Sequence, residues 1–367
     1  MAVVKKTKAV SKAAAALESE KVLSALQKQH GEQVGVRGGK FAPVQRIPLG
    51  IFPFDLATGG GIPRSRVAIF YGPESSGKSL NMYMAMLSVQ RMGQTAVLID
   101  AEHAWDEDWG RLIGLDLTKL IIIQPDNAEQ AVDAAEAFLY AKDVGIVGVD
   151  SVSAMITENE VKSGAEKMIV AGSAMAVTKM VHKAGVALSV GAKSGHLPSL
   201  LVISQTRYEI GKMFGDPEKF TGGNALRFIS SLTCRFYGKP VMVKEISENK
   251  PAFKYVQGVV KKYRCPIIGN SFEYNQCILP HGKLRIGQVE AWNTVEAFLK
   301  AQGHLFKIKT GWNLLGREYK TLESAKADYR EDAKFKMQCE STIAATAVKI
   351  DSIPAKAKID KATGEII

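Results

Sequence analysis

The stretch YGPESSGKSL, residues 71–80, decides the fold of this 367-residue chain. It contains the pattern G-x-x-x-x-G-K-S, a glycine-rich loop whose backbone N–H groups surround phosphate oxygens. The apolar run RVAIFY (66–71) precedes it and predicts a buried strand, and a methionine-rich helix is expected over 79–92. This order of strand, loop and helix is the context that the motif requires, so the sequence predicts a nucleotide-binding α/β fold.

The loop residues are expected to bind ATP together with Mg²⁺. Lys78 would reach the β- and γ-phosphates, and Ser79 would place its hydroxyl on the metal ion. The nucleotide-binding residues predicted from the loop are Gly72, Pro73, Glu74, Ser75, Ser76, Gly77, Lys78, Ser79 and Leu80. Kinases, transporters, switches, helicases and recombinases share such loops, so the loop alone leaves the type of protein open.

Strands and helices alternate downstream of the loop, and the strands are continuous apolar runs. This pattern predicts a parallel sheet with helices on both faces, in which ligands bind at the carboxyl ends of the strands. The runs 231–238 and 255–265 lack helical crossovers, which indicates an antiparallel edge. The other strands are expected at 94–100, 120–124, 144–150 and 199–205.

Three polar residues follow these strands and would meet at the edge of the sheet that carries the loop. Asp150 ends VGIVGVD and would hold Mg²⁺ through water, although a strand-terminal Asp also serves as a helix cap. Glu102 follows AVLID by two residues; it is either an exposed carboxylate or the group that orients the attacking water. Gln205 follows LLVIS and could bond a γ-phosphate as an ordering switch. Lys78, Glu102 and Gln205 form the predicted catalytic group.

A long glycine-rich segment, 206–228, follows Gln205. Residues 205–240 hold six Lys or Arg against three acids, interleaved with four Phe or Tyr before position 230. Basic and aromatic residues together favour contact with single-stranded nucleic acid, whereas the same composition also fits an exposed hairpin. Composition leaves both interpretations open.

Overall composition predicts a soluble cytoplasmic protein with no membrane contact. The chain is 46% hydrophobic, carries a net charge of +11, and contains no apolar run long enough for a transmembrane helix. Its four cysteines lack metal-type spacing and are expected as free thiols. Residues 1–40 carry eight Lys or Arg against three Glu, which indicates either a solvated tail or a segment that binds a polyanionic partner. The pattern of residues 12–29 predicts an amphipathic helix that ends at Gly31.

Five segments in order resemble the bacterial RecA recombinases: LQKQHG, YGPESSGKS, LIDAEHAWD, VGVDSVSA and VISQTRYEIGKMFGDPEKFTGGNALRF. GPESSGK and MFGDPEKFTGGNALRF are the most specific of these. The likeness runs from about Leu17 to at least Pro266, and more faintly through the C-terminal unit around GWNLLGREY.

This resemblance implies an α/β RecA-type P-loop ATPase core with a mainly parallel twisted sheet, an N-terminal helical docking segment and a small C-terminal α/β domain. The implied activity is homologous pairing and strand exchange by a filament of this chain on single-stranded DNA, with double-stranded DNA as second partner and DNA-dependent ATP hydrolysis. The alternative is a DNA-translocating motor such as a hexameric helicase. The expected divisions are a basic tail and polymerisation helix (1–40), the ATPase core with its DNA-binding loops (41–282), the C-terminal domain (283–348) and a tail (349–367).

The resemblance also assigns roles outside the phosphate loop. It places the adenine near Asp106 and Trp109, Phe228 at the subunit interface, and Lys261 across that interface on the neighbour's ATP. The family's second lysine at this place is replaced by Tyr263, with Arg264 adjacent as the candidate substitute. The added nucleotide-binding residues are thus Asp106, Trp109, Asp150 and Lys261; the metal residues are Ser79 and Asp150; the interface residues are Phe228, Lys261 and Arg264.

Two DNA-binding loops are implied, near 157–170 and 205–222. The expected DNA contacts are Lys162, Lys167, Met168, Arg207, Lys212, Met213, Phe214, Gly222, Gly223 and Asn224. The first loop departs from the family pattern, because the helix after it offers lysines where arginines are expected. Residues 351–367 balance three lysines against three acids where the family has an acidic tail, which predicts less restrained DNA binding. Such departures would suit a bacteriophage-encoded homologue.

Overall fold

The computed structural model describes residues 18–35, 43–163, 172–208, 218–220, 223–244, 246–264, 267, 269–280 and 284–351. Contacts divide the chain into two units, Met1–Gln45 and Arg46–Ile367. The predicted division near residue 40 lies close to this boundary, whereas the divisions near 283 and 349 stay predictions.

The described part of the first unit is a helix over residues 18–30 followed by the 3-10 helix η1 (Glu32–Val34). The backbone N–H of Gly31 donates to the carbonyl of Gln27, and Gly31 has a φ of 92°, so the helix ends where the sequence predicts. Val22 and Leu26 are 59% and 42% exposed, which leaves an apolar stripe of this helix in contact with solvent.

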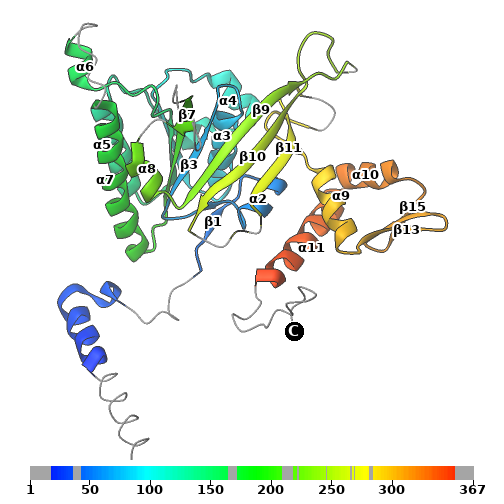
Figure 1. The fold of residues 1–367 in the computed structure, drawn as a ribbon, viewed down its shortest axis with the longest axis horizontal. Helices are drawn as coiled ribbons and strands as arrows, with labels where there is room; N and C mark the ends of the chain where they lie inside the picture. Colours follow the sequence, from blue (N-terminus) through cyan, green and yellow to red (C-terminus); the bar gives the residue numbers. More distant parts are fainter. Residues whose placement is uncertain are drawn as a thin grey trace, which may run out of the picture. The chain divides into compact units, whose positions relative to one another are not determined.

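The second unit is built on a sheet of ten described strands (Figure 1). Their order is β12-β11-β10-β9-β3-β7-β6-β4-β5, and β8 pairs with β7. The bounds are β3 (Val67–Gly72), β4 (Thr95–Asp100), β5 (Leu120–Ile123), β6 (Val144–Asp150), β7 (Ser199–Tyr208), β8 (Glu218–Phe220), β9 (Leu232–Val241), β10 (Phe253–Tyr263), β11 (Ser271–Cys277) and β12 (Val289–Glu290). A separate pair, β1 (Arg46–Ile47) and β2 (Ile62–Pro63), is antiparallel.

The sheet has a parallel half and an antiparallel half. Strands β9, β3, β7, β6, β4 and β5 are parallel neighbours, whereas β10, β11 and β12 continue from β9 with antiparallel pairing. The predicted parallel core with an antiparallel edge is therefore confirmed.

Successive side chains of a strand point to opposite faces of the sheet, so one hydrophobic core forms on each face. In β3, Ala68 and Phe70 pack with helix α3 (Lys78–Arg91), whereas Val67, Ile69 and Tyr71 pack with α5 (Ala128–Tyr140) and α7 (Gly172–Ser194). Both faces are covered, so the strands are apolar throughout. Also present are α2 (Phe52–Ala57), α4 (Glu107–Ile113), η3 (Leu117–Lys119), α6 (Glu158–Ser163) and α8 (Gly223–Ile229).

A cluster of four phenylalanines holds β3 from the antiparallel side. The ring of Phe70 lies 4.8 Å from that of Phe236, and Phe54 lies 5.0 Å from Phe272. All four side chains are buried. Burial of such rings stabilises the strand that leads into the phosphate loop by several kcal/mol, on the order of 2 per ring.

The C-terminal part contains α9 (Trp292–Ala301), the antiparallel strands β13 (Leu305–Ile308), β14 (Gly311–Leu314) and β15 (Arg317–Tyr319), and helices α10 (Leu322–Glu331) and α11 (Ala333–Asp351). Helices α10 and α11 are separated at Asp332. Its carboxylate accepts from the N–H groups of Lys334 and Phe335, so this residue caps the second helix.

The structure differs from the sequence prediction after Gln205. Strand β7 does not end there but continues to Tyr208, because Thr206, Arg207 and Tyr208 pair with β8. The expected loop 206–228 therefore contains a short hairpin and helix α8 within its described parts.

Candidate nucleotide-binding and catalytic site

Sheet register brings the predicted site residues to one edge. Gly72 at the end of β3 lies opposite Gln205 of β7, and Asp100 at the end of β4 lies opposite Asp150 of β6. These are the carboxyl ends of neighbouring parallel strands, where open α/β sheets bind ligands.

The phosphate loop has the backbone that a bound anion requires. Gly77 precedes α3 with a φ of 96°, and a Cβ added at Gly72 would lie 2.2 Å from the carbonyl oxygen of Phe236. Only glycine fits these two positions, which leaves the backbone N–H groups and the start of α3 open to phosphate oxygens.

Lys78 is buried and folds back over its own loop. Its Nζ donates to the carbonyl oxygens of Gly72 (3.1 Å) and Pro73 (2.7 Å). Burial lowers the pKa of Lys78, and the nearby carboxylates of Asp150 and Glu102 oppose that shift. A buried ammonium group held mainly by carbonyl oxygens is suited to exchange them for phosphate oxygens.

Asp150 is buried beside Ser79. Burial raises the pKa of Asp150 to about 6, while the Ser79 hydroxyl lowers it and the charge of Glu102 raises it. Among the described residues no three His, Cys, Asp or Glu gather as a metal site. One carboxylate and one hydroxyl suit Mg²⁺ whose remaining ligands are water and phosphate oxygens, so these residues fit the predicted ion.

Glu102 and Gln205 are joined by a direct hydrogen bond, and each of them also contacts a serine. The Ser151 hydroxyl donates to Glu102 Oε1 at 2.5 Å, and Gln205 Nε2 donates to the same oxygen at 3.5 Å. The backbone N–H of Gln205 in turn donates to the Ser153 hydroxyl at 2.9 Å. The structure thus joins the predicted carboxylate and the predicted switch residue in one network.

A cavity of about 460 Å³ opens beside the phosphate loop. Loop residues 75–80 line one side, and Tyr83 and Trp109 contribute aromatic rings. The opposite side comes from the antiparallel half of the sheet and its connections: Lys250, Pro251, Lys254, Ile278 and Leu279. Rings and aliphatic side chains next to a phosphate loop suit a nucleotide base.

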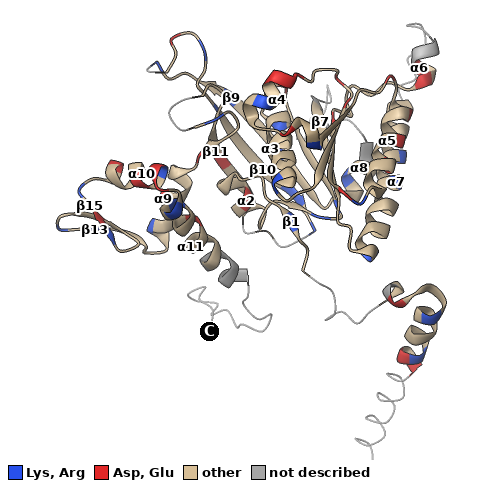
Figure 2. Ribbon diagram, turned by 180° about the vertical axis from the view of Figure 1, so that it is seen from behind, with Lys and Arg blue, Asp and Glu red and all other residues tan. Residues whose placement is uncertain are grey.

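Asp106 and Asp100 have structural roles in this region. Asp106 caps α4 by accepting from the N–H of Trp109 at 3.0 Å, which orients the helix that carries Trp109. Further acidic side chains begin this helix (Figure 2). Asp100 accepts from the N–H groups of Ala104 and Trp105 and from Gln124, so it holds the segment after β4.

Two of the predicted interface residues, Phe228 and Arg264, lie together at the end of α8. Phe228 is 67% exposed, and its backbone carbonyl accepts from Lys262 and Arg264. Lys261 is exposed on β10 and is not part of the cavity lining. The two cations therefore hold the backbone that carries this exposed ring.

The predicted DNA contacts fall mainly outside the described residues. Six of them lie outside the described part of the chain: Lys167, Met168, Lys212, Met213, Phe214 and Gly222. Lys162, Arg207, Gly223 and Asn224 lie in α6, β7 and α8, of which the structure describes the backbone at these positions.

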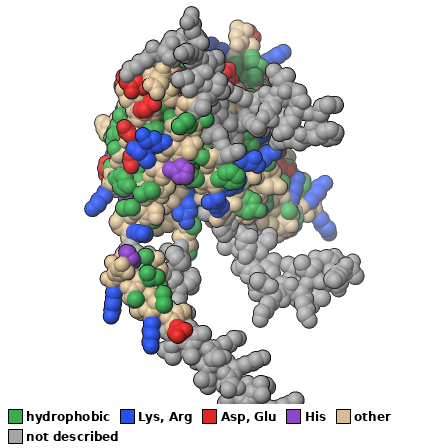
Figure 3. Space-filling model, turned by 60° about the vertical axis from the view of Figure 1, so that its left-hand side comes forward, with side chains coloured by type: hydrophobic (Ala, Val, Ile, Leu, Met, Phe, Trp, Pro, Cys, Tyr) green, Lys and Arg blue, Asp and Glu red, His purple; other side chains and the backbone are tan. Residues whose placement is uncertain are grey.

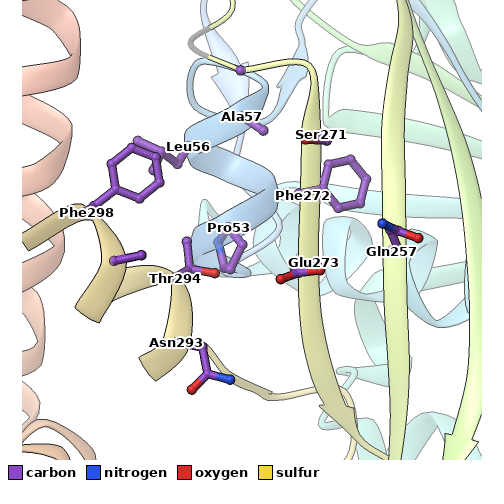
Figure 4. A pocket seen from close by; sticks show the side chains of 12 residues that line it. Pro53, Leu56, Ala57, Gln257, Ser271, Phe272, Glu273, Asn293, Thr294 and Phe298 are labelled. Carbon is purple, nitrogen blue, oxygen red and sulfur yellow. The ribbon is translucent and has the colours of Figure 1, made fainter. Parts of the chain in front are cut away.

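A second cavity, of about 440 Å³, lies between α2, β11 and α9. Phe298 of α9 faces Leu56 of α2 across it, and Glu273 and Asn293 add polar groups (Figure 4). None of the predicted site residues that the structure describes lines this cavity.

A family model described as the RecA N-terminal domain matches residues 16–274. The chain belongs to the RecA family. The α/β fold expected from the resemblance is confirmed by this match and by the sheet described above.

Protein RecA of Saccharopolyspora erythraea is 38% identical over 216 residues, which cover 58% of this chain and 61% of that protein. Protein RecA of Acholeplasma laidlawii is also 38% identical, over 58% of this chain and 64% of its own length. The chain thus spans under two thirds of the RecA proteins that it matches. The solved structure of the RadB recombinase aligns with a TM-score of 0.45 and 17% identity, covering 62% of this chain and 95% of its own.

Sequence reasoning missed several residues of this RecA-family site. Ser151 and Ser153 follow Asp150 directly, so their position after a strand could have identified them. No position after a predicted parallel strand marks the other cavity residues, because only the folding of the antiparallel strands brings them to the loop. These residues are Lys250, Lys254, Ile278 and Leu279. No helix in the described ranges is long and apolar enough to cross a membrane.

Proposed function

We propose that this chain is an ATP-dependent homologous recombination protein that forms filaments on single-stranded DNA and catalyses homologous pairing and strand exchange. Hydrolysis of ATP is proposed to be DNA-dependent. Membership of the RecA family and the names of its RecA relatives support the general function.

One observation carries the proposal: Glu102 and Gln205 share a hydrogen-bonded network at the edge that holds the phosphate loop. Gln205 also lies in β7 at the start of the segment expected to bind DNA. A group at this position can couple occupancy of the nucleotide site to the DNA-binding segment.

In the proposed mechanism, Lys78 leaves its loop carbonyls and neutralises the charge of the triphosphate. Ser79 and Asp150 would hold Mg²⁺, which supplies further charge neutralisation at the phosphates. Glu102, oriented by Ser151, would accept the proton of the attacking water.

The face made by α5 and α7 supports the proposed assembly into filaments. It carries exposed Met175, Val186 and Val190 on α7, and Figure 3 shows hydrophobic and basic side chains side by side on this face. The N-terminal helix presents its own exposed apolar stripe. Both features suit contacts between copies of the chain.

Electron microscopy with single-stranded DNA and a slowly hydrolysed ATP analogue tests the proposal. Continuous helical filaments support a recombinase, whereas discrete rings would favour the hexameric motor. Lys78→Ala should abolish DNA-stimulated hydrolysis, and normal turnover by this variant would refute the assignment of the site.

A further inference from the structure

Lys254 lies on β10 and reaches over the phosphate loop. It pairs with Pro240 on β9 and Gln276 on β11, so the sheet holds its backbone on both sides. A Cβ added at Gly77 would lie 3.7 Å from Lys254 Cδ, which places the aliphatic stem against the residue that precedes α3.

The cavity around Lys254 is cationic. Lys78, Lys250 and Lys254 line it, and no Asp or Glu is among its lining residues in the described part of the chain. The charge of Lys254 lowers the pKa of Lys78, so the two ammonium groups repel each other across this space. Gathering like charges costs free energy that a bound polyanion offsets.

Lys254 is also free to take a ligand. It makes no hydrogen bond or ion pair with any residue that the structure describes, although it is partly buried. Burial lowers its pKa, which a phosphate contact would reverse by favouring the ammonium form.

We propose that Lys254 is a phosphate-binding residue of the nucleotide site, a second cation that the antiparallel half of the sheet supplies to the polyphosphate held by the loop. This inference rests on the proposed function and adds a residue to its site. The ligand is the phosphate chain of a nucleoside di- or triphosphate.

The position of Lys254 predicts a role in affinity. The stem of Lys254 lies against Gly77, the residue before α3, whereas Glu102 follows β4 and Asp150 ends β6. Lys254 should strengthen the binding of ADP and ATP alike.

Binding measured without DNA tests this inference with ADP, inorganic tripolyphosphate and adenosine as probes. Lys254→Met keeps the stem and removes the charge, so ADP and tripolyphosphate should bind about 10-fold more weakly while adenosine binds as before. Lys254→Arg should restore most of the affinity. Lys244→Met, the same change at an exposed lysine of the β9–β10 connection, should bind ADP like the wild type.

Equal ADP affinity in the wild type and Lys254→Met would overturn the inference, and so would an equal loss of adenosine binding. If Lys78→Ala loses ADP while Lys254→Met keeps it, the nucleotide site stands and this inference falls. If the wild-type chain binds none of the three probes, the proposed function fails and the inference fails with it.

Discussion

The hydroxyl of Ser151 donates to Glu102 Oε1 at 2.5 Å, and the side chain of Ser151 is fully buried. Glu102 itself lies on an exposed segment after β4, and this hydrogen bond ties its carboxylate to the residue that follows the rigid strand β6. A carboxylate that acts on water must be held in position, and a buried hydroxyl from the neighbouring strand end provides that.

Ser151→Ala should lower kcat for ATP hydrolysis about 10-fold and leave ADP affinity unchanged, because the variant frees Glu102 without altering the phosphate loop. Steady-state kinetics and ADP titration measure the two effects. Ser341→Ala, which removes an exposed hydroxyl on α11, is the matched control. Unchanged kcat in Ser151→Ala would show that the hydrogen bond does not position the carboxylate.

Gln205→Ala should uncouple DNA binding from nucleotide. Its amide contacts Glu102, and its backbone is held by Ser153 at the point where the chain leaves toward β8. We expect ATP to tighten single-stranded DNA binding by the wild type but not by Gln205→Ala, as measured by fluorescence anisotropy. Ser153→Ala should weaken the coupling partially, since it loosens only the backbone. A full ATP effect in Gln205→Ala would rule out the switch role.

Phe228→Ala should reduce assembly without destabilising the monomer. The ring is 67% exposed, so its removal should change the free energy of unfolding by less than about 0.5 kcal/mol. Light scattering with DNA and ATP measures assembly, and thermal melting measures stability. Met337→Ala, at a side chain 70% exposed on α11, should assemble normally. Loss of assembly in both variants, or in neither, would contradict an interface at Phe228.

Asp55 should make stability depend on pH. Its carboxylate accepts from the N–H groups of Leu49 and Gly50, but burial raises its pKa to about 7 against 3.8 in the unfolded chain. The folded protein therefore binds more protons between these values, and stability falls as pH rises from about 4 to 7.

Because Asp55 keeps partial contact with solvent, we expect the free energy of unfolding to fall by an amount on the order of 2 kcal/mol over this pH range. This is less than the full pKa shift of Asp55 implies. Stability is measured by denaturant unfolding from pH 5 to pH 8 without nucleotide. Asp55→Asn should remove the part of the pH dependence that comes from Asp55, whereas Glu248→Gln, at an exposed residue, should keep it. Parallel pH profiles for Asp55→Asn and the wild type would contradict the assignment.

Gly258→Ala should destabilise the sheet. Gly258 of β10 lies opposite Phe272 of β11, and an added Cβ would lie 2.0 Å from the Phe272 ring. The buried ring must then move out of the phenylalanine cluster, which should cost about 1–3 kcal/mol in urea unfolding. Gly185→Ala in α7 meets nothing within 4 Å and should stabilise by up to about 1 kcal/mol. Equal stability of the two variants would argue against this packing.

The phosphate loop, the parallel strands around it and the polar residues that follow them could be predicted from the order of residues. Local patterns were sufficient here, because apolar runs mark buried strands and the ends of parallel strands meet at one edge. Gly72, Lys78, Glu102 and Asp150 could therefore be assigned to one site from the pattern of residues alone.

The residues that complete that site come together through contacts between distant parts of the chain. Strand β10 carries Lys254 to Gly77, 177 positions earlier in the chain (254 minus 77), through antiparallel pairing that leaves no local signature. The extension of β7 beyond Gln205 likewise depends on its pairing with β8. Contacts between residues far apart in the sequence depend on strand order and register, which follow from the packing of the whole core.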